Sequence, residues 1–141
     1  MSRATLARKV MFQCLHRYEV SDWSVEKNTE TFGPCYTETS HGHNYELVGF
    51  FSGAIDQETG MIINLKDVDD ILKQSVSVLD GKFLNQDVEE FKSKVPTTEN
   101  LISFLAGLVQ EKVQDFENIQ LSKLRLYETD NLWVDWINEP S

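Results

Sequence analysis

The three histidines of this chain are the residues whose type and spacing best fit metal chemistry. His41 and His43 are separated by one glycine, and His16 is the only other histidine in the 141 residues. In a β-strand, residues two apart point to the same face about 6.6 Å apart along the chain, so their imidazoles can bind one metal ion. On a helix the same pair diverges by about 200° and cannot. The spacing therefore predicts a metal site on a strand.

His16 ends a stretch in which apolar and polar residues alternate. The residues that share one face of a predicted strand over 5–16 are Val10, Phe12, Cys14 and His16. If this strand pairs with the strand of His41 and His43, a third imidazole reaches the same metal. Three neutral nitrogen ligands suit Zn²⁺ and leave a fourth position open for chemistry. Cys14 is a competing ligand on this face or, more simply, a small core residue.

The elements that must position these residues follow a ββααββ order. Period-2 alternation predicts strands over 5–16, 41–53, 121–128 and 132–138. Helical spacing predicts one helix over 66–79 and a second that begins at Thr97 or Thr98, where a hydroxyl can cap it. Residues 17–40 show no clean period and are predicted to form a long loop. The pattern indicates an antiparallel α+β fold with two helices packed on one face of the sheet.

Composition and charge exclude several classes of protein. The chain is 40% hydrophobic and 26% charged, which is typical of a globular protein, and its length fits a single domain over 1–141. A net charge of −10 argues against nucleic-acid binding, which needs a basic face. Two cysteines, no signal-peptide pattern and no long apolar stretch predict a cytoplasmic protein with reduced thiols and no membrane contact.

Six blocks of the sequence carry a resemblance to a known family. They are FQCLH (12–16), FGPCYTETSHGHNY (32–45), IDQETGMIINL (55–65), LDGKFLN (79–85), PTTEN (96–100) and YETDN (127–131). Together and in this order they resemble the 6-pyruvoyltetrahydropterin synthase family, which includes the 6-carboxytetrahydropterin synthases of queuosine biosynthesis. The most specific block places Cys35 six positions before the H-G-H-N-Y motif.

The resemblance implies a fold, a reaction and an assembly. The fold is the T-fold, in which the sheets of several chains close into a barrel; the assembly is a hexamer, a dimer of trimers, with active sites at subunit interfaces. The reaction is that of a lyase that converts 7,8-dihydroneopterin triphosphate with loss of triphosphate, in tetrahydrobiopterin-type biosynthesis. The zinc ligands that it implies are His16, His41 and His43, and zinc acidifies carbon-bound hydrogens beside the hydroxyls it binds.

The resemblance also assigns roles to residues outside the histidine group. Cys35 matches the catalytic cysteine, which needs a nearby positive charge to form a thiolate at neutral pH. Glu128 matches the glutamate that anchors the pterin ring, whose N–H groups a carboxylate can accept in a bidentate way. The sequence supports this role independently, because Glu128 continues an apolar row on its strand, where a carboxylate is costly unless paired. Thr97 and Thr98 match positions that line the pterin pocket.

One departure from the family leaves the function open. Where the family has Asp-His, this chain has Asp80 followed by Gly81, with Lys82 next to them. The histidine normally completes a Cys–Asp–His proton relay, so here the relay is incomplete at Gly81. Two alternatives to the synthase follow. One is the 6-carboxytetrahydropterin synthase branch, with the same substrate and metal; the other is a non-catalytic, zinc-containing pterin-binding paralogue.

Overall fold

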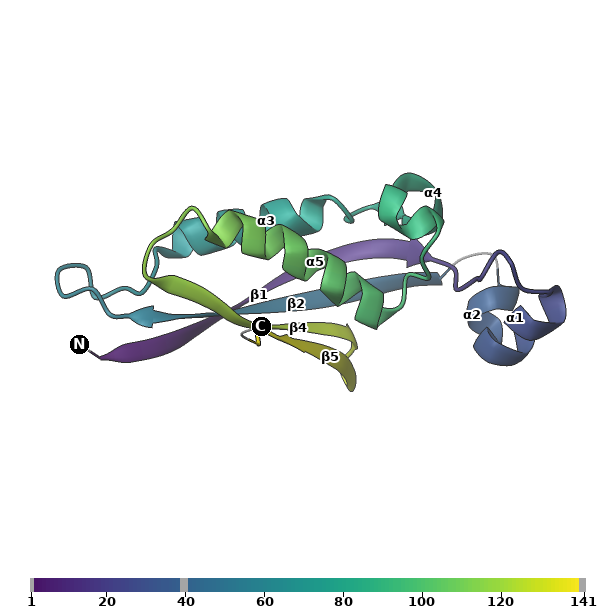
Figure 1. Cartoon of the computed structure of the whole chain (residues 1–141), viewed down its shortest axis with the longest axis horizontal. Coiled ribbons are helices and arrows are strands. Elements are labelled where there is room, and N and C mark those ends of the chain that lie inside the picture. Colours follow the sequence, from purple (N-terminus) through teal and green to yellow (C-terminus); the bar gives the residue numbers. More distant parts are fainter. Residues whose placement is uncertain (1, 39–40, 140–141) are drawn as a thin grey trace.

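The computed structural model describes residues 2–38 and 41–139, apart from the side chain of His41, and contains a five-stranded sheet (Figure 1). The strands are β1 (Arg3–His16), β2 (His41–Ala54), β3 (Lys82–Phe83), β4 (Ile119–Thr129) and β5 (Leu132–Ile137). Their order across the sheet is β3-β1-β2-β4-β5. Neighbouring strands pair antiparallel, except that β3 runs parallel to β1.

Two long helices cover one face of this sheet. They are α3 (Leu65–Ser77) and α5 (Thr98–Val113), which lie side by side above the strands in Figure 1. Four short helices complete the fold: α1 (Val25–Phe32), α2 (Pro34–Thr37), α4 (Leu84–Asp87) and the 3₁₀ helix η1 (Glu89–Lys92). In Figure 1, α1 and α2 lie beyond the end of the sheet at which β1 ends and β2 begins. Among the described residues, no helix is long and apolar enough to cross a membrane.

The core lies between the sheet and the two long helices. Burial alternates along the second half of β1, so the face predicted from the sequence is confirmed; its buried members are Val10, Phe12, Cys14 and His16. The fully buried side chains of the core include Tyr45, Leu47, Phe51, Leu72, Leu101, Leu105, Leu124 and Leu126. Burial of each large apolar side chain contributes about 1.5–3 kcal/mol, so this layer holds the strand ends in place.

Both long helices begin at polar caps that the sequence provides. The Thr97 hydroxyl accepts a hydrogen bond from the Asn100 N–H at 3.1 Å, which identifies Thr97 as the N-cap of α5. The Asn64 carboxamide oxygen accepts one from the Lys66 N–H at 2.9 Å and caps α3 in the same way. Of the two threonines proposed as caps, the structure therefore selects the first.

The prediction of a long loop over 17–40 is wrong. Within it, α1 begins at a Ser24 cap whose hydroxyl accepts a hydrogen bond from the Lys27 N–H at 3.1 Å. The buried Asn28 side chain accepts from the Val20 N–H at 2.9 Å and donates to the Val20 carbonyl at 3.1 Å. These polar anchors stabilise the segment in place of an apolar stripe, so a search for hydrophobic periodicity misses it.

The predicted ββααββ order is incomplete, and the sheet is not wholly antiparallel. Helices α1 and α2 lie between the first two strands, and β3, α4 and η1 lie between the two long helices. The parallel strand β3 has only two residues, too few for any alternation to show. The first long helix ends at Ser77, because the Leu79 N–H donates to the Val76 carbonyl in a turn that leads towards β3.

Candidate metal centre

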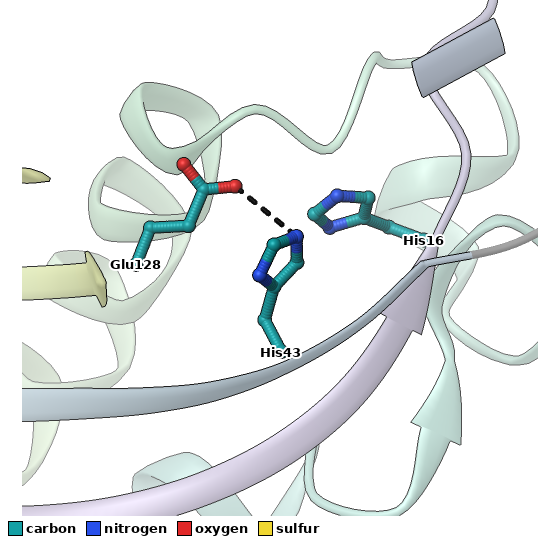
Figure 2. Close-up of side chains that lie close together, drawn as sticks. All are labelled: His16, His43 and Glu128. Atoms are coloured by element: carbon teal, nitrogen blue, oxygen red, sulfur yellow. Dashed lines mark ion pairs between the residues drawn. The ribbon is translucent and has the colours of Figure 1, made fainter. Parts of the chain in front are cut away.

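Three side chains from three neighbouring strands meet at one end of the sheet. His16 ends β1, His43 lies near the start of β2 and Glu128 lies near the end of β4; Figure 2 shows them pointing toward one another. One ligand atom from each lies within 4.8 Å of the other two. The His43 Nε2 atom is 3.4 Å from the Glu128 Oε1 atom. Strand alternation explains this arrangement, because all three positions face the helix side of the sheet.

The third histidine is placed by its backbone alone. His41 is the direct partner of His16 in the register of β1 and β2, and Cys14 is the partner of His43. This register confirms the predicted pairing of the two histidine strands. The side chain of His41 lies outside the described part of the chain, so its role as a ligand stays a prediction.

Two tyrosines enclose His16, which is fully buried. The Tyr45 hydroxyl lies 3.0 Å from His16 Nδ1, within hydrogen-bonding distance, and the Tyr18 ring stacks on the imidazole at a centroid distance of 4.8 Å. Burial is the main cause that raises the pKa of Tyr45 above its ordinary value, so its hydroxyl stays neutral. Two imidazoles and a carboxylate in reach of one point form a donor set that fits Zn²⁺.

Cys35 lies on α2, whose backbone contacts the residues that follow β1. The Tyr18 N–H donates a hydrogen bond to the Cys35 carbonyl at 2.9 Å, and the cysteine is partly buried. Burial raises the pKa of the Cys35 thiol, and the carboxylates of Glu128 and Glu38 raise it further. The protein's own charges therefore oppose a thiolate, and a base at this position requires a positive charge close by.

Asp80 and Gly81 form a turn that is fixed to β1. The Asp80 carboxylate accepts a hydrogen bond from the Gln13 N–H at 2.9 Å, and the Gly81 N–H donates to the Gln13 carbonyl at 2.7 Å. Burial and, to a lesser extent, Asp80 raise the pKa of Cys14 to about 12, which makes that thiol an inert core group. The carboxylates that raise the pKa of Cys35 are those of Glu128 and Glu38, whereas Asp80 raises the pKa of Cys14.

The two predicted pocket threonines have different surroundings. Thr97 caps α5 through its hydroxyl. Thr98 is buried and lies beside Tyr18, the tyrosine whose ring stacks on His16. Thr98 is thus close to the candidate metal centre, whereas the observed hydrogen bond of Thr97 is a structural one.

Sequence reasoning missed three residues of this centre. Tyr45 follows His43 by two positions on the same strand face, so period-2 alternation already contained the signal. Glu38 lies three positions after Cys35, one helical turn away, which is also a local signal. Tyr18 lies just past the end of β1, where no periodicity applies, and nothing in the sequence marks its stacking on His16.

Comparison with known proteins identifies the class to which this fold and site belong. The sequence model of the family described as 6-pyruvoyl tetrahydropterin synthase matches residues 5–139, and the chain belongs to this family. The 6-pyruvoyl tetrahydrobiopterin synthase of Dictyostelium discoideum is 37% identical over 141 residues, covering 99% of this chain and 100% of the relative. The Homo sapiens protein of the same name is 35% identical over 130 residues, 92% of this chain and 88% of the relative.

A solved structure supports the same assignment at the level of the fold. The 6-pyruvoyl tetrahydropterin synthase of Caenorhabditis elegans superimposes with a TM-score of 0.90 at 27% sequence identity. The match covers 99% of this chain and 98% of that one. The T-fold expected from the sequence blocks, with two helices on one face of the sheet, is therefore confirmed for the single chain.

Proposed function

We propose that this chain is a zinc-dependent 6-pyruvoyltetrahydropterin synthase-like lyase that converts 7,8-dihydroneopterin triphosphate with loss of triphosphate. The observation that carries the proposal is the convergence of His16, His43 and Glu128 beside the segment of Cys35. The names of the similar proteins support a role in tetrahydrobiopterin-type biosynthesis. The one continuous core supports action as a single domain.

The proposed zinc ligands are His16, His43 and, from its register position opposite His16, His41. Bound zinc supplies a Lewis acid that polarises the side-chain oxygens of the substrate and acidifies the adjacent carbon-bound hydrogens. Glu128 lies close enough to be a further ligand, but we assign it to the pterin, whose donor edge a carboxylate accepts. Its contact with His43 keeps the carboxylate at the edge of the metal centre, where the ring would dock.

Cys35 is the proposed base that removes the carbon-bound proton. Its thiol is partly buried, and its backbone is hydrogen-bonded to Tyr18, the residue whose ring covers His16, which places this segment beside the proposed zinc ligands. Thr98 and Tyr18 form a neutral wall beside it. Asp80 belongs to the proposed relay, with a water in the open space above Gly81 or the neighbouring Lys82 in place of the missing histidine.

The proposed assembly is a homohexamer, a dimer of trimers in which sheets close into a barrel. Among the described residues, β1 pairs on its outer edge only at Cys14 and Leu15, and β5 forms the opposite edge of the sheet. Open edges are templates for strand pairing with another copy. Within one chain, Asp80 raises the pKa of Cys14, whereas Glu128 and Glu38 raise that of Cys35, so an active site shared between copies also gives the relay a way to form.

A non-catalytic pterin-binding paralogue is the second candidate, and Gly81 favours it. The position that carries the relay histidine in the family holds no side chain here. The raised pKa of the Cys35 thiol also favours the non-catalytic paralogue, because it disfavours the thiolate that would act as the base. The 6-carboxytetrahydropterin synthase branch shares substrate and metal with the leading proposal, so only the product separates these two.

The deciding experiment is turnover of 7,8-dihydroneopterin triphosphate by the zinc-loaded protein, with the product identified by mass. We expect triphosphate release together with 6-pyruvoyltetrahydropterin, and loss of both in Cys35→Ala. A 6-carboxy product assigns the protein to the queuosine branch. Tight pterin binding without any turnover supports the non-catalytic paralogue and rejects the enzyme.

Glu128→Gln separates the two uses of this carboxylate. The variant keeps the shape but replaces a charged acceptor with an amide, and a charge-assisted hydrogen bond contributes about 1.5–3 kcal/mol. We expect pterin affinity, measured by calorimetry, to fall roughly tenfold or more, with zinc content unchanged. Loss of zinc with unchanged pterin affinity would instead make Glu128 a metal ligand.

A further inference from the structure

The segment that carries Cys35 is fastened to the end of β1 by two consecutive residues. The Arg17 Nε–H donates to the Tyr36 carbonyl at 2.8 Å, and the Tyr18 N–H donates to the Cys35 carbonyl at 2.9 Å. The Arg17 guanidinium also lies over the ring of Tyr36, 4.5 Å from its centroid, and that ring is buried. The backbone carbonyls of Cys35 and Tyr36 are therefore tied directly to the two residues that follow His16.

Arg17 is in turn held by one carboxamide from α4. The Arg17 N–H donates to the Asn85 Oδ1 atom at 2.8 Å, and the Asn85 Nδ2 atom donates to the Arg17 carbonyl at 2.7 Å. An amide side chain supplies both a donor and an acceptor, so Asn85 satisfies both backbone groups just past the last residue of β1. A continuous hydrogen-bonded chain runs from Asn85 through Arg17 to the helix of Cys35.

This chain compensates for a weak local structure. Cys35 lies on α2, a helix of only four residues that starts after Gly33, whose φ of 56° is in the left-handed region. A single helical turn does not hold its own conformation, because nucleation costs more than its few hydrogen bonds return. The position of the Cys35 thiol relative to His16 must therefore come from tertiary contacts. Among the described contacts, Arg17 and Tyr18 reach this helix from the end of β1, and Asn85 of α4 holds Arg17.

We propose that Arg17 and Asn85 are positioning residues that hold Cys35 in place at the metal centre. The inference rests on the proposed role of Cys35 as the base. Neither side chain needs to contact the substrate for this role. A displacement of a reacting group by about 1 Å can lower a rate about a hundredfold, so loosening either link should affect the proton-transfer step more than substrate binding.

The test compares the zinc-loaded wild type with Arg17→Gln, Arg17→Lys and Asn85→Asp. Arg17→Lys keeps the charge but lacks the planar group that both stacks on Tyr36 and donates to its carbonyl. Asn85→Asp keeps the acceptor and removes the donor. The matched control is Arg8→Gln, which breaks a two-bond ion pair between β1 and Asp69 of α3 without touching the Cys35 segment.

Three measurements report on the Cys35 segment. The first is kcat and KM for 7,8-dihydroneopterin triphosphate, the second is amide hydrogen exchange over 33–38, and the third is the pH profile of alkylation by iodoacetamide. Cys14 is only 3% exposed, so Cys35 is the thiol that the reagent reaches, with Cys35→Ala as the blank.

In each of the three variants we expect kcat to fall at least about tenfold with KM within about twofold, because the base is misplaced while the pterin contacts remain. Exchange over 33–38 should rise, and the midpoint of the alkylation profile should move toward the value of a free cysteine, about 8.5. Zinc content should stay at the wild-type level, and Arg8→Gln should change none of these readouts.

Wild-type exchange and an unchanged alkylation profile in both Arg17→Lys and Asn85→Asp would overturn the proposal. Faster exchange with wild-type kcat would also overturn it, since the links would then be structural only. If the wild type shows no turnover, the function proposed above fails, while the exchange and alkylation measurements still decide whether Arg17 and Asn85 hold Cys35.

Discussion

Tyr45 and Tyr18 determine how His16 is presented at the candidate metal centre. The hydrogen bond between the Tyr45 hydroxyl and Nδ1 fixes the orientation of the His16 ring. The stacked ring of Tyr18 limits rotation about the same side chain. A buried imidazole held at both its edge and its face is preorganised for a metal, so less ordering entropy is lost on binding.

Tyr45→Phe tests this second shell without removing a ligand. The substitution deletes one hydroxyl and leaves the ring stacked on Phe12 at a centroid distance of 5.1 Å. Loss of such a partner typically lowers metal affinity by about 10–100-fold, and we expect a change of that size for zinc. Competition with a chromophoric chelator measures it. Tyr127→Phe is the control, since that hydroxyl contacts Arg125 and not the metal centre; equal affinities in both variants would contradict the prediction.

Gly81→His tests whether the missing relay histidine limits the rate. The backbone φ of Gly81 is +75°, a region that costs side chains about 1–2 kcal/mol, but a Cβ there meets nothing within 4 Å. We expect a loss of stability of about that size together with faster turnover, because general acid–base help is typically worth about 10²–10⁴ in rate. Gly81→Ala carries the same backbone strain without the imidazole. Equal turnover in the two variants would show that this position is not where the proton donor is needed.

At the scale of elements, the start of α5 serves both stability and the site. Thr97 caps the helix, and the next residue, Thr98, is buried beside Tyr18. A frayed first turn would therefore loosen the wall beside Cys35 as well as the helix. The sequence places these two roles on adjacent residues because the cap must lie outside the helix and the next side chain points into the core.

Thr97→Ala should weaken the helix start directly. Removal of an N-cap hydroxyl typically costs about 1 kcal/mol, so we expect the free energy of unfolding to fall by about that amount, with an unchanged m-value in urea. Thr97→Ser keeps the hydroxyl and should stay close to the wild type. A drop of the same size in the serine variant would mean that the Thr97 methyl group, and not the cap, provides the stability.

At the scale of the whole molecule, the sheet face opposite the helices exposes several large apolar side chains. Met11 is 65% exposed, Trp133 45% and Ile137 59%, and all three lie on the edge strands or next to an open edge. Between them, paired charges such as Arg125 and Asp135 cross the strands at 2.7 Å. A closed barrel of several copies would turn this face inward and pair both edges, which accounts for the exposed side chains in a single chain.

Met11→Glu combined with Ile137→Glu should disfavour such a barrel. Two added carboxylates on the inward face must be desolvated on closure, so we expect smaller species in sedimentation velocity than the wild-type assembly. Val25→Glu is the control, because Val25 is 64% exposed on α1 and lies away from this face. A wild-type sedimentation coefficient in the double variant would reject closure through these edges.

Local patterns in the sequence predicted much of the site. Period-2 alternation placed His16 on the buried face of β1, and the H-x-H spacing placed His41 and His43 on one face of the next strand. The helix caps and the apolar stripes were equally local. The predicted start and end of α3 and the predicted start of α5 therefore lie within two residues of those observed. These features were predictable because each depends on residues that lie within one or two turns or pleats of one another.

The rest depended on contacts between segments far apart in the chain. Glu128 meets His43 only because β4 pairs with β2, and Asn85 reaches Arg17 only because α4 packs beside the end of β1. The period of a single strand or helix does not encode which segment lies beside it or in which register two strands pair. The sequence by itself therefore determined which faces carry the chemistry, whereas the tertiary structure decided which residues share the site, because only the packing of the core fixes the distances between those faces.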